Sequence, residues 1–170
     1  AIFDITKLDW INSQHLNNLS KESFKTHIMP FIDNLGIDYS QYQQLDELIE
    51  AMRSVKPNLQ LIAQALIPYL DTFKEYDEKG VSKFLIGSEE TLKLVIESLQ
   101  TIKSWSEVEI DSMLVKIQEK LGLKTPQMNQ PIRIALTGST QSPSLGLTIK
   151  LMGRNKSIEL LNKALEFITK

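Results

Sequence analysis

The 170-residue sequence contains no cysteine and only two histidines, His15 and His27. Without cysteine the chain has no disulfide, thiolate metal ligand or cysteine nucleophile, a composition that fits the reducing cytoplasm where we expect the protein. A zinc site needs two or more converging ligands, and two isolated histidines argue against a histidine-rich centre. We therefore expect no metal site and no cofactor in this chain.

Long apolar runs are also missing. The longest ones, such as residues 61–70, are about half as long as the ~20 residues that cross a membrane. No basic start is followed by an apolar segment, so no signal peptide is predicted. We expect no membrane association. Because the first residue is Ala1 rather than Met, we expect a processed protein or a fragment.

Acidic residues are absent from residues 120–158, although the formal net charge of the chain is -2. Residues 1–100 contain 15 acidic and 9 basic residues, whereas residues 101–170 contain 6 and 10. A basic stretch in an acidic protein attracts polyanions, so we interpret it as a surface for nucleic-acid phosphates, with an ordinary solvated surface as the alternative. It contains no aromatic residue, which argues against base stacking. Its basic residues are Lys120, Lys124, Arg133, Lys150, Arg154 and Lys156.

Alternation of apolar and polar residues, typical of strands, is scarce, and apolar side chains recur at spacings of three and four. The sequence therefore predicts an all-α fold with about eight or nine helices and no sheet. Residues 71–87 are polar and are predicted as a loop with at most one short turn. The change in charge favours two helical subdomains, residues 1–100 and 101–170. Predicted helix starts are Ser20, Ser40, Ser88, Ser106, Thr125 and Ser142, and predicted helix ends are Gly36, Gly122, Gly138 and Gly153.

No set of residues predicts an active site. Asp46 and Glu50 share a helix face, but this spacing is common on solvated helices. Residues 138–142 lack the lysine and second glycine of a phosphate-binding loop. His15 lies among apolar residues, so we expect it to be buried or half-buried, and we expect Trp10 and Trp105 to anchor the core.

Three segments resemble bacterial-type glutamyl-tRNA synthetases, which are class I aminoacyl-tRNA synthetases. Residues 3–12, F-D-I-T-K-L-D-W-I-N, are similar to the family pattern F-D-x-x-K-L-x-W-x-N. Residues 131–138, P-I-R-I-A-L-T-G, followed by S-P-S-L at 142–145, resemble P-L-R-x-A-L-T-G and P-x-L. Residues 151–153, L-M-G, resemble the family's L-L-G ending. The order and spacing agree with the family over essentially the whole chain.

This resemblance implies that the chain is the helical C-terminal, anticodon-binding half of a glutamate–tRNA ligase. No segment resembles the family's H-I-G-H or K-M-S-K-S motifs, so ATP, and any Mg²⁺ with it, belongs to a catalytic half that this chain lacks. The chain alone is then expected to be inactive. Its expected partners are tRNA(Glu) and its own catalytic half, and no DNA is expected.

The resemblance also implies which residues contact tRNA. Arg133 corresponds to the family's arginine that contacts the anticodon loop. Residues 142–146 correspond to the loop and helix start that touch the second and third anticodon bases; they are Ser142, Pro143, Ser144, Leu145 and Gly146. Exposed N–H groups at such a helix start can donate to bases or phosphates. From the basic stretch, Lys150 and Arg154 are expected to contribute as well.

One departure concerns the first anticodon base. The family has an arginine two or three residues before a T-L pair. In this sequence Asn58 and Leu59 stand for that pair, and Val55 stands at the position of the arginine. Arg53 and Lys56 flank it and are the candidate substitutes. Whether the ligase also accepts tRNA(Gln) therefore stays open.

Two other functions remain as alternatives. In the first, the chain is an all-α protein-interaction domain, and its basic stretch binds an acidic partner. In the second, the chain is a regulatory domain that binds nucleic acid, with residues 126–152 as the helix pair of a helix-turn-helix motif.

Overall fold

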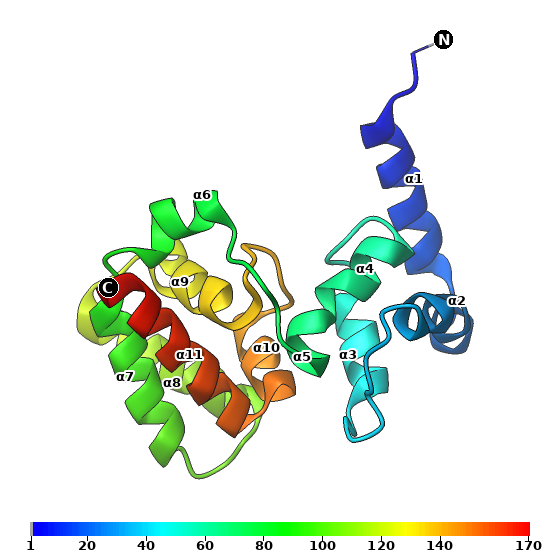
Figure 1. Ribbon diagram of the computed structural model, residues 1–170. Helices are drawn as coiled ribbons and strands as arrows, with labels where there is room; N and C mark the ends of the chain where they lie inside the picture. The colour runs from blue at the N-terminus through cyan, green and yellow to red at the C-terminus, as the bar shows by residue number, and fades with distance from the viewer. Residues whose placement is uncertain (1) are drawn as a thin grey trace. The chain divides into compact units, whose positions relative to one another are not determined.

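The computed structural model describes residues 2–170, which form helices and no strand (Figure 1). Nine of the α-helices have seven residues or more, which confirms the expected all-α class and helix number. Among the described residues, no helix has both the length and the apolar character needed to cross a membrane. In chain order the elements are α1 (Ile5–Asn18), α2 (Lys21–Asp33), α3 (Leu45–Met52), α4 (Leu59–Ala65), α5 (Ile67–Leu70), α6 (Glu78–Gly80), the π-helical turn η1 (Val81–Leu85), α7 (Glu89–Thr101), α8 (Glu107–Leu121), α9 (Thr125–Thr137), α10 (Leu145–Met152) and α11 (Arg154–Thr169).

The chain divides into two compact units, a first unit that ends at Thr72 and a second unit, Phe73–Lys170. This division differs from the boundary expected near residue 100. The reason is that α7 packs against α11 and α8, with Leu92, Val95 and Leu99 fully buried. The residues on either side of the charge change thus share one core, because surface charge does not decide which apolar faces pack together.

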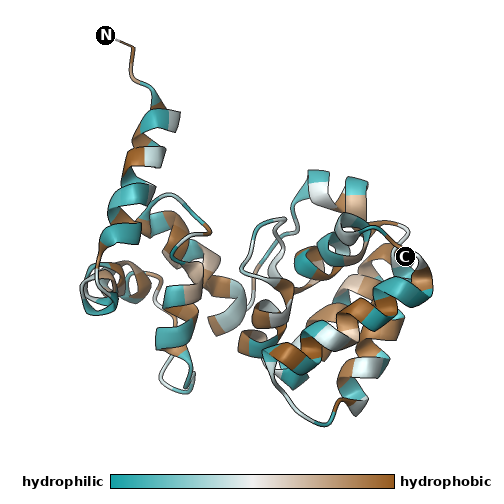
Figure 2. Cartoon of the chain, turned by 180° about the vertical axis from the view of Figure 1, so that it is seen from behind, coloured by the Kyte–Doolittle hydropathy of each residue, from teal (hydrophilic) through white to brown (hydrophobic). Residues whose placement is uncertain are grey.

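The first unit is built around α2, which packs against α3 and α4. Phe24, Ile28 and Ile32 lie on one face of α2 and are fully buried. Ser20 begins this helix as predicted, because its hydroxyl accepts a hydrogen bond from the N–H of Ser23. The third helix begins at Leu45 instead of near Ser40. The apolar residues gather on the inner sides of the helices (Figure 2).

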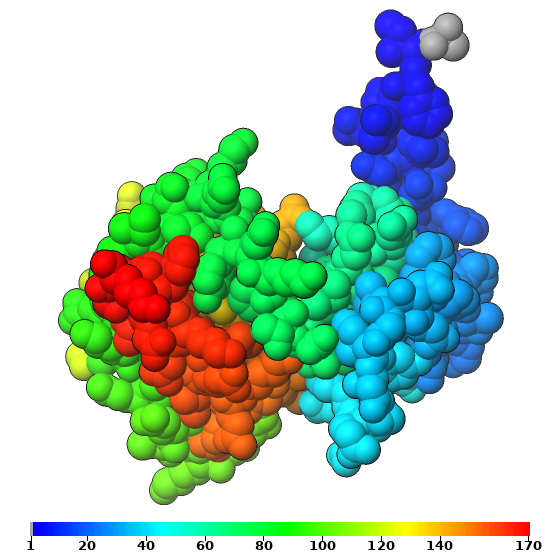
Figure 3. All heavy atoms as spheres, viewed as in Figure 1, coloured from blue at the N-terminus to red at the C-terminus, as the bar shows by residue number. Residues whose placement is uncertain are grey.

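Helix α1 corrects two predictions, because its first turns extend away from the rest of the first unit (Figures 1 and 3). Trp10 is 63% exposed, and His15 is exposed as well, so neither is a core residue. Leu16 is the buried residue of this helix. The apolar spacing predicted the helix correctly, but spacing does not show whether a partner covers the apolar face.

The second unit surrounds the second half of α9, where residues 131–137 are buried except for Arg133. Ile132, Ile134, Ala135 and Leu136 have no exposed surface. Helices α7, α10 and α11 and the turn η1 pack against α9. The glycines Gly122 and Gly138 end α8 and α9 in the left-handed conformation, as predicted.

The segment predicted as a loop, residues 71–87, is helical at 78–85. One tertiary and one local hydrogen bond hold the start of this helical segment. The N–H of Asp77 donates to the carbonyl of Gly138 over 2.7 Å, and the Asp77 carboxylate accepts from the N–H of Gly80. Gly138 has a φ of +71°, and a Cβ atom there would lie 2.7 Å from the Glu75 carbonyl oxygen. Glycine is therefore required at this position for both conformation and space.

We predict that Gly138→Ala lowers the free energy of unfolding of the second unit by about 2–4 kcal/mol, because strain and overlap add. The control is Gly122→Ala, where φ is +63° and no atom lies within 4 Å. There we expect a cost of about 1–2 kcal/mol from the backbone alone. Urea unfolding measures both values, and equal losses would contradict the close approach of residues 73–77.

Candidate nucleic-acid interface

Arg133 and Ser142, both predicted to contact the anticodon loop, lie together in the second unit. The Nε of Arg133 on α9 donates a hydrogen bond of 2.7 Å to the Ser142 hydroxyl, in the connection before α10. Thr148 of α10 contacts the same hydroxyl at 3.1 Å. Arg133 is half-buried. These bonds fix the plane of the guanidinium group relative to α9 and α10.

The start of α10 is enclosed by carboxylates of α8. The hydroxyl of Ser144, the N-terminal flanking residue, donates to Glu107 over 2.9 Å. The Asp111 carboxylate accepts a hydrogen bond from the N–H of Gly146, which by itself lowers the pKa of Asp111. The pKa is nevertheless raised above its usual value, because burial and the charge of Glu107 outweigh this bond. A carboxylate at this end is favourable because the helix dipole is positive there.

Three predicted tRNA-contacting residues at this helix start, Pro143, Leu145 and Gly146, are buried. The Gly146 N–H already has Asp111 as acceptor, so it is not the exposed donor that we expected. A side chain at Gly146 would overlap the Asp111 carboxylate. Ser144 is exposed. The surface of this segment is therefore formed by residues 139–142 and Ser144 rather than by the whole predicted segment.

Arg154 has a structural role at the end of α7. Its Nη1 donates to the carbonyl of Leu99 and its Nη2 to that of Ile102, each over 2.8 Å. Its guanidinium group lies 5.0 Å from the ring centroid of Trp105, whose Nε1 donates to the carbonyl of Lys150. Arg154 thus satisfies carbonyl groups that a helix end leaves without partners. Trp105 takes part in this packing, in contrast to the exposed Trp10.

Arg53 is held in a similar way in the first unit. Its Nη2 donates to the carbonyls of Leu19 and Ser20, and its Nη1 lies 3.3 Å from the Glu50 carboxylate. The guanidinium group is 4.5 Å from the centroid of the Phe24 ring. The side chain is only 10% exposed. Lys56, after α3, and Lys150, on α10, are half-buried.

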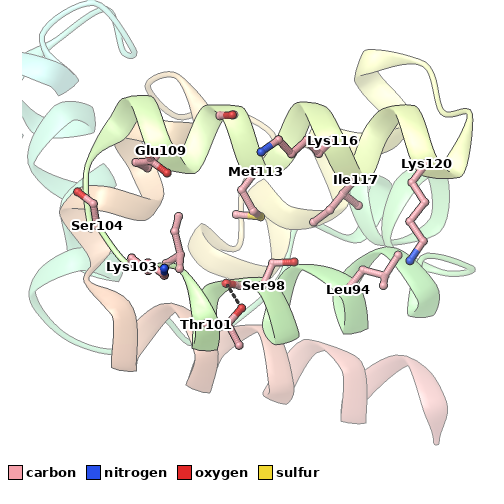
Figure 4. A pocket seen from close by; sticks show the side chains of 12 residues that line it. Leu94, Ser98, Thr101, Lys103, Ser104, Glu109, Met113, Lys116, Ile117 and Lys120 are labelled. Atoms are coloured by element: carbon pink, nitrogen blue, oxygen red, sulfur yellow. Dashed lines mark hydrogen bonds between the residues drawn. The ribbon is translucent and has the colours of Figure 1, made fainter.

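A groove between α7 and α8, with a volume of about 510 Å³, was not predicted from the sequence (Figure 4). Lysines lie along it, and of these only Lys120 belongs to the basic stretch identified in the sequence. The sequence signal that could have indicated this groove was the pair Lys116 and Lys120, one helical turn apart. The described residues contain no group of three or more His, Cys, Asp or Glu side chains that could hold a metal ion. The groove is lined by Leu94, Ser98, Thr101, Ile102, Lys103, Ser104, Glu109, Ser112, Met113, Lys116, Ile117 and Lys120.

Comparison with known families decides what kind of domain this is. A model of the family described as "Anticodon binding domain" matches residues 14–165. The chain belongs to the anticodon-binding domain family. The match spans both compact units, so neither unit alone represents the family.

Two solved structures share the fold of this anticodon-binding domain. A glutamate tRNA ligase from Elizabethkingia meningosepticum superposes with a TM-score of 0.81 at 19% identity, over 98% of this chain and 33% of that one. A glutamate-tRNA synthetase from Elizabethkingia anophelis has a TM-score of 0.77 at 20% identity, over 96% of this chain and 32% of that one. The chain therefore spans about a third of the length of these proteins.

The packing of α10 gives no support to a helix-turn-helix function for this anticodon-binding domain. A recognition helix presents one face to the bases of the major groove. Six of the eight residues of α10 are buried, so that it lacks such a face. They are Leu145, Gly146, Thr148, Ile149, Leu151 and Met152. The comparisons give no support to a protein-interaction domain either.

We predict that Arg154→Gln lowers the free energy of unfolding by about 2–4 kcal/mol, because two charge-assisted hydrogen bonds to carbonyl groups are lost. The control, Lys163→Gln, removes an exposed pair with Glu159 and should change stability by less than about 1 kcal/mol. Thermal and urea unfolding measure both. Unchanged stability of Arg154→Gln, together with weaker RNA binding, would show that Arg154 serves the ligand instead of the fold.

Proposed function

We propose that the chain is the tRNA-binding part of a glutamate–tRNA ligase and that it holds the anticodon arm of tRNA(Glu). The observation that carries this proposal is the family match over residues 14–165. The fold shared with two proteins named as glutamate-tRNA ligases supports the choice of glutamate. The resemblance of residues 131–145 to the anticodon-contacting segment of that family supports it independently.

Arg133 is the residue that we propose to read an anticodon base. Anticodon bases in a loop are splayed out of the stack, so their edges are accessible to side chains. A guanidinium group offers several donors in one plane, which suits a base edge better than the point charge of a lysine does. The hydrogen bond from Nε to Ser142 would orient this plane before RNA binds and so reduce the entropy lost on binding.

In the first unit, Lys56 is the better candidate for contact with the first anticodon base. Arg53 flanks the same position, but its guanidinium group contacts Leu19, Ser20 and Phe24 within its own unit. A lysine is a less selective donor than the arginine of the family pattern. We therefore propose that discrimination between tRNA(Glu) and tRNA(Gln) depends little on this position.

The exposed face of α1 supports a further part of the proposal, that this domain works next to a catalytic half that uses ATP. Several large apolar side chains are exposed on and before this helix, and such patches mark interaction surfaces. The two ligases with this fold are about three times as long as this chain. The exposed residues are Ile2, Phe3, Ile5, Leu8, Trp10 and Ile11.

We predict that Arg133→Ala weakens binding of tRNA(Glu) by about 1–3 kcal/mol, because a base contact with two donors is lost. The same variant should lose much less affinity for a tRNA(Glu) whose anticodon is exchanged. Lys150→Ala, as a phosphate contact, should weaken both RNAs about equally and lower the salt dependence by roughly one contact. Titration of each variant with both RNAs measures these differences.

Three results would contradict this assignment of roles. Equal losses for both RNAs in both variants would make Arg133 a phosphate contact. No loss in either variant would place the recognition surface elsewhere. Absence of tRNA binding by the native chain would overturn the proposed function as a whole. Arg133→Lys separates loss of the planar donor group from loss of charge.

We also predict that the 170-residue chain neither binds ATP nor forms glutamyl-adenylate, since its sequence has no phosphate-cradling motif. The measurement is glutamate-dependent exchange of pyrophosphate into ATP. Exchange above that of a blank containing no protein would overturn the assignment of chemistry to another part of the ligase.

A further inference from the structure

The groove lies where α7 and α8 run side by side (Figure 4). Ser98 of α7 and Ser112 of α8 both line it, and they do not fill the space as leucine or isoleucine would. Apolar side chains line it as well, among them Ile117, which is buried, and Met113, which is half-buried. The result is an open furrow with a polar rim rather than a sealed helix interface.

The rim is predominantly cationic. Lys116 and Lys120 come from α8 and Lys103 from the connection between α7 and α8, against a single carboxylate, that of Glu109. Within residues 2–170, none of the three ammonium groups has an ion pair with a carboxylate. Lys116 and Lys120 are four residues apart, and like charges at this spacing destabilise a helix. A bound anion would relieve this repulsion.

Hydroxyl groups add neutral donors to the same rim. The side chains of Ser98, Ser104 and Ser112 all line the groove. Their hydroxyls have no hydrogen-bond partner among the residues that the structure describes. Serine hydroxyls and lysine ammonium groups are among the side-chain donors that bind phosphate oxygens in nucleic-acid complexes.

We propose that this groove binds the phosphodiester backbone of the tRNA, as a second contact surface in addition to the one around Arg133. This inference rests on the proposed function, because the tRNA is the polyanion that the chain is proposed to hold. A nucleic-acid backbone supplies phosphates at regular intervals, which suits three lysines distributed along one furrow. In the part of the chain that the structure describes, no aromatic side chain lines the groove, so it contacts phosphate and ribose and does not stack bases.

The test compares two triple variants of the 170-residue chain. The groove variant is Lys103→Gln/Lys116→Gln/Lys120→Gln, and glutamine preserves helix propensity. The control is Lys79→Gln/Lys93→Gln/Lys170→Gln, which removes the same charge from exposed residues of the second unit outside the groove. The probe is an unmodified tRNA(Glu) transcript, titrated at several NaCl concentrations. Circular dichroism checks that each variant is folded, and the single variants Lys116→Gln and Lys120→Gln replace the triple variant if it is not.

We expect the groove variant to bind the transcript about tenfold more weakly than the native chain at 0.1 M salt. The slope of log affinity against log salt should be smaller in magnitude by about two units. The control should retain the native slope. Equal slopes for groove variant, control and native chain would overturn the groove proposal while leaving the proposed function intact. Failure of the native chain to bind the transcript would overturn both.

Polyglutamate of comparable charge tests for an acidic protein partner. If the groove is specific for a nucleic-acid backbone, polyglutamate competes poorly with the transcript for the native chain. If polyglutamate binds the native chain but not the groove variant, while the transcript binds both equally, the groove is a site for acidic protein and the proposal is wrong.

Discussion

Burial of α9 is the constraint on which the second unit depends. In the second half of this helix, four residues between 132 and 136 have no exposed surface. It is therefore stable only when η1, α7, α10 and α11 cover it. Arg133 is the one polar residue in this run; it is half-buried and donates to Ser142 in the connection between α9 and α10. The packing of the core thus decides where the guanidinium group meets the surface.

Polar groups in this chain serve two purposes that the structure separates. Arg53 and Arg154 donate to backbone carbonyls at the ends of structural elements, and Asp111 accepts from the start of α10. These groups are occupied inside their own units and stabilise helix termini. Among residues 2–170, the lysines of the groove between α7 and α8 have no ion pair with a carboxylate. They carry the charge that an RNA backbone can meet.

Much of the local structure could be predicted because capping is a short-range property. Ser20 and Ser106 accept hydrogen bonds from backbone N–H groups three residues later, as their sequence patterns predicted. Other starts were displaced: α9 begins after Lys124 and α10 after Ser144, and not after Thr125 and Ser142. Pro126 marked the first turn of α9 correctly, whereas Pro143 lies outside α10, before its flanking residue Ser144. The residue that actually flanks a helix depends on neighbouring elements.

The sequence by itself determined the helices, the basic stretch and the likeness to anticodon-binding segments, since each depends on residue spacing along the chain. Only the tertiary structure decided which cations are committed to the fold. Arg53 and Arg154 look equivalent to other basic residues in the sequence, yet carbonyl groups 33 to 55 residues away bind them. Lys103 and Lys116 lie outside the basic stretch, yet they line the same groove as Lys120. Charge along a chain is a one-dimensional property, whereas access to a ligand depends on what packs against each side chain.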